Sequence, residues 1–221
     1  VNTLIGGASG TYKTTLLDFI VSNAIQDAEQ KGIKLNIFYY SYEIDEITKK
    51  CNWLSGIIYR KHGIEIPPEK IKGLGNNRLT DEELKLVNAE IPLLDEMFSK
   101  INFRFTPINP TGIYKELFNF GESIGKVEYG EYTDDYGKIQ KKIVGYKPDN
   151  PDEVTLILLD HMSLVKKELV ADNKGVIDKY SEYCVLLRNL FGFSFINLQQ
   201  FNDSLSSVER AKFKGVDLSP Q

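Results

Sequence analysis

The sequence predicts an α/β domain with a central, mostly parallel β-sheet and helices on both faces. Short apolar runs of strand length alternate with longer segments whose apolar residues recur at helical spacing. The run 154–159 is almost uninterrupted aliphatic sequence, which is typical of a central parallel strand buried on both faces. A chain of 221 residues is expected to close around one core, so we predict a single domain over 1–221.

The predicted elements alternate between strands and helices along the chain. The first strand ends in two glycines, Gly6 and Gly7, and an amphipathic helix follows that turn. The strands are expected over 2–5, 35–42, 101–106, 154–159 and 194–198. The helices are expected over 13–31, 45–60, 80–100, 111–120 and 176–191.

Local signals mark several helix ends. Asp45 is expected to cap the second helix, and Thr80 with Glu83 has the spacing of a capping box. Pro92 should kink or divide the helix that Thr80 opens, because proline removes a backbone donor and crowds the preceding turn.

The segment 127–146 has the pattern of a β-hairpin. Residues 127–132 and 138–146 alternate in polarity around the polar turn 133–137. This segment interrupts the alternation of strands and helices, and we therefore interpret about 126–147 as an insertion into the α/β domain.

Composition and charge exclude several classes of protein. A net charge of -4 argues against a broad basic face that coats nucleic acid, so any such contact should be local. No apolar run approaches the roughly 20 residues that a membrane span needs. Cys51 and Cys184 lie far apart without a CxxC pattern, which indicates neither a disulfide framework nor a zinc site. We expect a reducing compartment, the cytoplasm, or the host cytoplasm for a viral protein.

A glycine-rich turn connects the first strand to the first helix. A phosphate-binding loop needs small residues whose N–H groups wrap phosphates, a lysine for the outer phosphates and a hydroxyl for magnesium. The pattern GxxxxGK[ST] is met except at Tyr12, where glycine is usual, and Gly10 is expected to supply the backbone freedom instead. A plain tight turn is the alternative, but the position after the first strand and before an amphipathic helix favours nucleotide binding. The expected ATP-binding residues are Gly7, Ala8, Ser9, Gly10, Thr11, Tyr12, Lys13, Thr14 and Thr15.

Acidic residues follow two of the predicted strands. Asp160 ends the aliphatic strand, as in a Walker B motif, and is expected to hold Mg²⁺ with Thr14; a simple helix cap is the alternative. Glu43 follows the second strand, and parallel topology should bring it toward the nucleotide as the catalytic base, whereas a solvated glutamate at a helix start is the alternative. His161 is expected to be a packed residue with a satisfied ring and no chemical role.

Two glutamines end the last predicted strand. Gln200 is expected to sense the γ-phosphate through a hydrogen bond, and Gln199 is the competing candidate. Strand alternation points their side chains in opposite directions.

Four segments together resemble the C-terminal motor domain of DnaB-type replicative helicases, which has a RecA-like fold. They are the loop Gly7 to Thr15, the segments Ser41-Tyr42-Glu43-Ile44 and Leu156 to His161, and Leu198-Gln199-Gln200-Phe201-Asn202. The resemblance implies the catalytic roles of Lys13, Glu43 and Gln200. It also implies final strands and an arginine finger beyond Gln221, so we expect the domain to be C-terminally incomplete and the chain, which begins at Val1, to be an excised piece.

The same resemblance implies partners. Members of this family form hexameric rings with ATP at subunit interfaces and single-stranded DNA in the central channel, so we expect a homohexamer and possible contact with a primase or loader. Two loops of this chain match the DNA-contacting loops of the family, and their cations are expected to contact DNA phosphates. The alternative is that these cations are ordinary solvated side chains. These cations are Lys166, Lys167, Lys174, Arg210, Lys212 and Lys214.

Other functions remain as alternatives. A RecA-like recombinase or a regulatory P-loop ATPase would share the phosphate loop and the second-strand glutamate, and would form a filament or ring. A small-molecule phosphotransferase would need an arginine-bearing lid, and no arginine-rich segment stands out.

Overall fold

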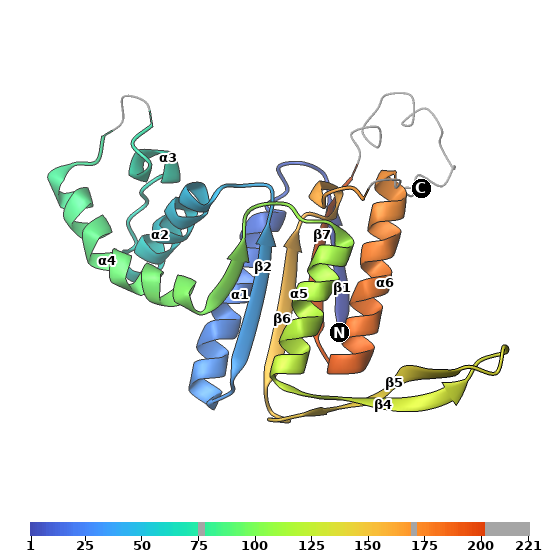
Figure 1. Cartoon of the computed structure of the whole chain (residues 1–221). Helices are drawn as coiled ribbons and strands as arrows, with labels where there is room; N and C mark the ends of the chain where they lie inside the picture. The colour runs from blue at the N-terminus through green and yellow to red at the C-terminus, as the bar shows by residue number, and fades with distance from the viewer. Residues whose placement is uncertain (75–77, 169–171, 202–221) are drawn as a thin grey trace, which may run out of the picture.

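The computed structural model describes residues 1–74, 78–168 and 172–201. Five parallel strands form the central sheet, in the order β1-β7-β6-β2-β3 (Figure 1). Their bounds are β1 Asn2–Gly7, β2 Leu35–Ser41, β3 Ile101–Arg104, β6 Val154–Asp160 and β7 Ser194–Gln200. Because β7 lies between β1 and β6, the carboxyl end of β7 lies between the carboxyl ends of β1 and β6.

Helices cover both faces of the sheet (Figure 1). On one face, α1 (Lys13–Lys31), α2 (Glu46–His62) and α4 (Asp81–Ser99) contribute to one apolar core. On the other face, α5 (Pro110–Ser123) and α6 (Asn173–Phe191) contribute to a second core. The prediction of a mostly parallel sheet with helices on both faces is confirmed.

Strand β2 contributes side chains to both apolar cores. Ile37 and Tyr39 belong to the core with α1 and α2, whereas Phe38 and Tyr40 belong to the core with α5 and α6. Successive side chains of a strand point to opposite faces, so an uninterrupted apolar run is required where both faces are covered.

The helix ends agree with the local sequence signals. Asp45 accepts a hydrogen bond from the Thr48 N–H, and Thr80 and Glu83 form the complete capping box. The expectation that Pro92 divides the helix is wrong, because α4 runs continuously through it. Val87, Leu94 and other buried residues on both sides of Pro92 pack into one core, which holds the two halves in line despite the lost backbone donor. Two short elements were not predicted, α3 (Pro68–Ile71) and η1 (Met162–Leu164).

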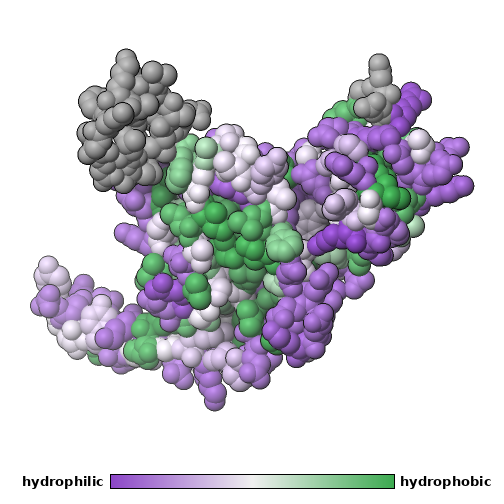
Figure 2. Space-filling model, turned by 180° about the vertical axis from the view of Figure 1, so that it is seen from behind, coloured by the Kyte–Doolittle hydropathy of each residue, from purple (hydrophilic) through white to green (hydrophobic). Residues whose placement is uncertain are grey.

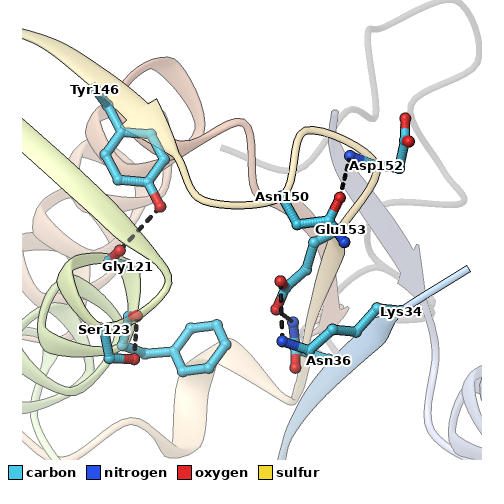
Figure 3. A network of polar contacts seen from close by, with 9 residues as sticks. Lys34, Asn36, Gly121, Ser123, Tyr146, Asn150, Asp152 and Glu153 are labelled. Atoms are coloured by element: carbon cyan, nitrogen blue, oxygen red, sulfur yellow. Dashed lines mark hydrogen bonds and ion pairs between the residues drawn. The ribbon is translucent and has the colours of Figure 1, made fainter.

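The predicted hairpin insertion is present. Strands β4 (Gly125–Thr133) and β5 (Ile139–Pro148) pair antiparallel and project from the end of the sheet opposite the carboxyl ends of the strands (Figure 1). At its root the Tyr146 hydroxyl donates to the Gly121 carbonyl at 2.9 Å (Figure 3). The hairpin therefore lies far from the turn that contains Lys13.

The chain returns from the hairpin to β6 through a polar junction. The Glu153 carboxylate accepts hydrogen bonds from Lys34 at 3.0 Å and Asn36 at 2.6 Å (Figure 3). These contacts tie the start of β6 to the start of β2, and so help to set the register in which Ser41 lies opposite Asp160.

The surface behind the view of Figure 1 has an apolar area. Figure 2 shows hydrophobic residues gathered over the middle of that face. The exposed apolar residues of β1, α1 and the residue before β1 include Val1, Leu4, Leu16 and Phe19. Within the described ranges, no helix has both the length and the apolar character needed to cross a membrane.

Glu168 joins the loop after β6 to both helices of the second face. Its carboxylate accepts hydrogen bonds from Lys179 at 2.5 Å and from the Thr111 N–H at 3.1 Å. The Lys179 ammonium, followed by Thr111, lowers the Glu168 pKa to about 2. The folded state therefore gains stability from the ionised carboxylate above the unfolded pKa near 4.3, and loses it as the pH falls toward 2.

We predict that Glu168→Gln lowers the melting temperature by a few degrees at pH 7, because the amide keeps the shape but loses the charge. The difference from the parent should shrink as the pH falls from about 4.5 to about 2. Thermal unfolding followed by circular dichroism across this pH range measures both quantities. A difference that is constant with pH would show that the ionised carboxylate does not supply the stability.

Candidate nucleotide site

The turn between β1 and α1 has an unusual backbone conformation. Gly10 has φ 73°, as expected, but Tyr12 also lies in the left-handed region, with φ 55°. Gly10 was expected to adopt a left-handed backbone in place of a glycine at position 12. The structure shows that Gly10 does so, but that Tyr12 adopts it as well. A side chain in this conformation costs about 1–2 kcal/mol, which the surrounding structure must offset. Tyr12 is the N-cap residue of α1, and its exposed side chain makes no capping hydrogen bond.

Lys13 is held over the inside of this turn. Its ammonium donates to the Ala8 carbonyl at 2.6 Å and to the Thr11 hydroxyl at 3.4 Å, and Thr11 donates to the same carbonyl at 2.8 Å. The turn thus curls around a positive charge at the N-terminus of a helix of 19 residues. A helix N-terminus and a lysine together attract an anion such as a phosphate.

Gly7 is packed too tightly to carry a side chain. A Cβ atom at this position would lie 2.8 Å from the Thr11 Oγ1 atom and 3.3 Å from the Lys13 Cδ atom. The absence of a side chain at Gly7 lets Lys13 lie inside the turn.

We predict that Gly7→Ala weakens ATP binding at least about 10-fold, because the new methyl group displaces Thr11 and Lys13 and removes charge-assisted contacts to phosphate. Isothermal titration calorimetry measures the affinity. Thermal unfolding of the same variant is the control, and a melting temperature within a few degrees of the parent would assign the loss to the turn. Unchanged affinity would contradict the proposed packing.

Three separate elements bring polar groups to the carboxyl edge of the sheet. Thr14, at the start of α1, donates its hydroxyl to the Asp160 carboxylate at 2.6 Å, and its Oγ1 atom lies 3.5 Å from Glu43 Oε2. Strands β2 and β6 are neighbours, with Ser41 opposite Asp160, and the Tyr42 N–H donates to the Asp160 carbonyl at 2.8 Å. The structure therefore gathers the expected magnesium residues and the expected base around one hydroxyl group.

Asp160 has an environment suited to a cation. Its side chain is buried, and within the described residues its Oδ1 atom has no hydrogen-bond partner. Burial raises the Asp160 pKa, against the lowering effects of the Thr14 hydroxyl and the Lys49 ammonium. A buried carboxylate oxygen without a partner is costly, and a bound cation would satisfy it.

Glu43 lies beside a cavity of about 520 Å³ between α1 and α2, which Thr14, Thr15 and Asp18 also line. Its side chain is exposed, so solvent reaches the carboxylate. Within the described residues, no three His, Cys, Asp or Glu side chains converge as a preformed metal site.

The two glutamines and His161 lie near this edge in different settings. Gln199 donates to the Ser163 hydroxyl at 2.8 Å, on the face of the sheet away from α1. Leu198 packs in the core with α1, so alternation places Gln200 on that α1 face, opposite Gly7 in register. His161 is buried as expected, and its Nδ1 atom has no hydrogen-bond partner among the described residues.

The lysines of the first candidate DNA loop are exposed. Lys166 and Lys167 follow η1, and Lys174 lies in the first turn of α6, all after the carboxyl end of β6. The other three cations, Arg210, Lys212 and Lys214, lie outside the described residues.

The fold of this chain was compared with those of known proteins. No protein-family model and no curated protein matches this chain. A solved structure, described as a DnaB-like replicative helicase and its interactions with primase, superimposes on 99% of this chain with a TM-score of 0.58. This chain shares the fold of the matched part of that helicase chain. The sequence identity is 13%, and the match covers 42% of the helicase chain, so this chain spans less than half the length of its structural neighbour.

Sequence reasoning missed one polar cluster next to this site. Lys49, Asp18 and Tyr39 meet beneath the carboxyl edge of the sheet. A signal existed, because Asp18 lies one helical turn after Thr14 on an otherwise apolar face, but its partner could not be named without the tertiary structure.

Proposed function

We propose that this chain is the motor domain of an ATP-dependent DNA helicase, which couples ATP hydrolysis to movement along single-stranded DNA during replication. The observation that carries the proposal is the meeting of Thr14, Asp160 and Glu43 from three separate elements, next to a turn that encloses Lys13. The shared fold with a DnaB-like replicative helicase supports the choice of a nucleic-acid motor among the P-loop ATPases.

The residues present fit Mg²⁺ and ATP. Gly7 leaves space that a Cβ would fill, Lys13 offers a positive charge, and the Asp160 Oδ1 atom lacks a partner in the described structure. The turn from Gly7 to Thr15 would bind the triphosphate, and Thr14 and Asp160 would hold Mg²⁺ directly or through water. The bound Mg²⁺ would supply charge that stabilises the transferred phosphoryl group.

Glu43 is proposed to act as the general base. It would accept a proton from a water molecule as the water oxygen forms a bond to the γ-phosphorus. The bond between the γ-phosphorus and the bridging oxygen breaks, and that oxygen leaves with its electron pair on ADP. Gln200, on the face shared with α1, is proposed to sense the γ-phosphate. The accessible Glu43 carboxylate beside the cavity of about 520 Å³, which has room for water, suits this role.

DNA binding is assigned to the loop that follows β6. Lys166, Lys167 and Lys174 are exposed cations in a chain of net charge -4, and they follow the strand that ends in Asp160. A contact between this loop and DNA phosphates would therefore lie close in sequence to Asp160, the proposed magnesium ligand. Arg210, Lys212 and Lys214 are proposed to contribute similarly.

Self-association is a further part of the proposal. The apolar area on the face of Figure 2 suits contact with more protein, and a homohexameric ring is proposed for the full-length protein. The structure of the DnaB-like helicase is described together with the interactions of that helicase with primase. A primase or a loader is proposed as a partner of this chain.

The test is ATP hydrolysis by the full-length protein with and without single-stranded DNA, at several salt concentrations. We expect turnover that rises on addition of DNA, with a DNA affinity that falls steeply as salt increases. Turnover that is indifferent to DNA would contradict the helicase and favour a regulatory ATPase. Electron microscopy then distinguishes a ring from the filament that a RecA-like recombinase would form.

A further inference from the structure

Lys49 is a fully buried lysine with two polar partners. Its ammonium donates to the Asp18 carboxylate at 2.8 Å and to the Tyr39 hydroxyl at 2.8 Å. Tyr39 in turn donates to the same Asp18 oxygen at 2.8 Å, and its side chain is fully buried. We call Asp18, Tyr39 and Lys49 the buried triad.

The buried triad is costly to assemble, which suggests that it has a task. Removing an ammonium and a carboxylate from water costs several kcal/mol per ion, and a well-packed apolar trio is often at least as stable. Here every group is satisfied by another member, and the Lys49 ammonium also lies 4.3 Å from the centre of the Tyr39 ring. The arrangement therefore has one defined geometry.

The triad joins the three elements that position the candidate catalytic groups. Asp18 lies on α1 one turn after Thr14, Tyr39 lies on β2 four residues before Glu43, and Lys49 lies on α2 six residues after Glu43. Glu43 itself belongs to the exposed connection between β2 and α2, where backbone contacts are few. The triad is thus the buried polar link between the helix that holds Thr14 and the two elements on either side of Glu43.

The triad also acts electrostatically on the same edge. Burial raises the pKa of the Tyr39 hydroxyl well above its ordinary value, with Asp18, Asp160 and Glu43 adding to the effect. Asp160 and Glu43, the two carboxylates outside the triad, therefore lie within electrostatic range of it, and the buried Lys49 ammonium acts on Asp160.

We propose that Asp18, Tyr39 and Lys49 are positioning residues, which hold Glu43 at the distance from Thr14 and Asp160 that hydrolysis requires. This inference rests on the proposed ATPase function. None of the three residues would contact the nucleotide, so their removal should reduce turnover and spare ATP affinity.

The test compares two variants of the full-length protein. The triple variant Asp18→Leu, Tyr39→Phe, Lys49→Met replaces the whole triad by apolar groups and leaves no member of the triad as an unpaired charge. The control Lys61→Met, Glu90→Leu removes another polar link between α2 and α4, at the opposite end of α2, where Glu90 pairs with both Lys61 and His62. We expect both variants to unfold cooperatively near the parent temperature and to bind ATP within about 3-fold of the parent. Turnover should fall at least about 10-fold in the triple variant alone.

A second readout shows whether the effect runs through Glu43. Adding Glu43→Gln should reduce turnover much less in the triple variant than in the parent, because coupled residues give non-additive losses. Turnover equal to that of the control, or fully additive losses, would overturn the inference. If the triple variant does not fold, Tyr39→Phe alone should lower turnover and spare ATP affinity, and parental turnover would overturn the inference equally.

A parent that does not hydrolyse ATP would instead contradict the proposed function. The inference is then judged by a crystal structure of Tyr39→Phe. The distance between Thr14 Oγ1 and Glu43 Oε2, which is 3.5 Å in the parent, should lengthen by about 1 Å or more, and an unchanged distance would overturn the inference.

Discussion

Lys13→Ala is expected to weaken ATP binding by about 100-fold, the largest loss of affinity for any single change in this chain. The Lys13 ammonium lies inside the turn, where it donates to the Ala8 carbonyl and the Thr11 hydroxyl. A triphosphate in the turn would take these donors, and charge-assisted hydrogen bonds are worth about 1.5–3 kcal/mol each. Each 1.4 kcal/mol corresponds to about a factor of 10 in affinity.

The measurement is calorimetric titration of ATP in the presence of Mg²⁺, with Lys31→Ala as the matched control. Lys31 belongs to the same helix but lies in its last turn, where it pairs with Asp27 in solvent. We expect the control to bind ATP as the parent does. Parental affinity in Lys13→Ala would show that the turn does not bind the triphosphate.

Glu43→Gln is expected to keep ATP affinity within a few-fold and to reduce turnover several hundredfold or more. The amide is close in size to the carboxylate but accepts no proton, and general-base catalysis typically contributes about 10²–10⁴-fold. The Glu43 Oε2 atom lies near the Thr14 hydroxyl without a short hydrogen bond that would commit it to a structural role.

Steady-state hydrolysis and ATP titration on the same preparations separate these effects. Glu46→Gln is the control, because Glu46 begins α2 three residues later and pairs with Lys50 at the surface. Turnover in Glu43→Gln equal to that of the parent would require another base. Loss of ATP affinity in parallel with turnover would instead assign Glu43 to binding.

Much of the fold was determined by local patterns. The glycine-rich turn between β1 and α1, the helix caps at Asp45 and Thr80 and the aliphatic run of β6 each follow from short-range rules. The hairpin was also predictable, since alternation and a polar turn are local features. The continuous course of α4 through Pro92 was not, because packing on both sides of the proline outweighed its local preference.

The candidate site was predictable in its residue types and in part of its geometry. Parallel topology alone indicates that the carboxyl ends of β2 and β6 share an edge, and this places Glu43 near Asp160. Strand alternation predicted that the two glutamine side chains point in opposite directions. Which of them faces α1 could be told only from the tertiary structure, in which β7 pairs with β1 and Gln199 donates to Ser163. The left-handed backbone of Tyr12 could not be predicted, because a tyrosine adopts it only where the surrounding structure imposes it.

By itself, the sequence determined the chemical groups available to this protein: a lysine and a hydroxyl at a helix start, and carboxylates at two strand ends. Only the tertiary structure decided that the Asp160 and Glu43 carboxylates both lie next to the Thr14 hydroxyl. It also decided that Lys49 lies buried with Asp18 and Tyr39 beneath them. The physical reason is the range of the interactions. Turns and caps are set by neighbours along the chain, whereas the partner of a buried charge is set by strand order and helix packing between residues far apart in sequence.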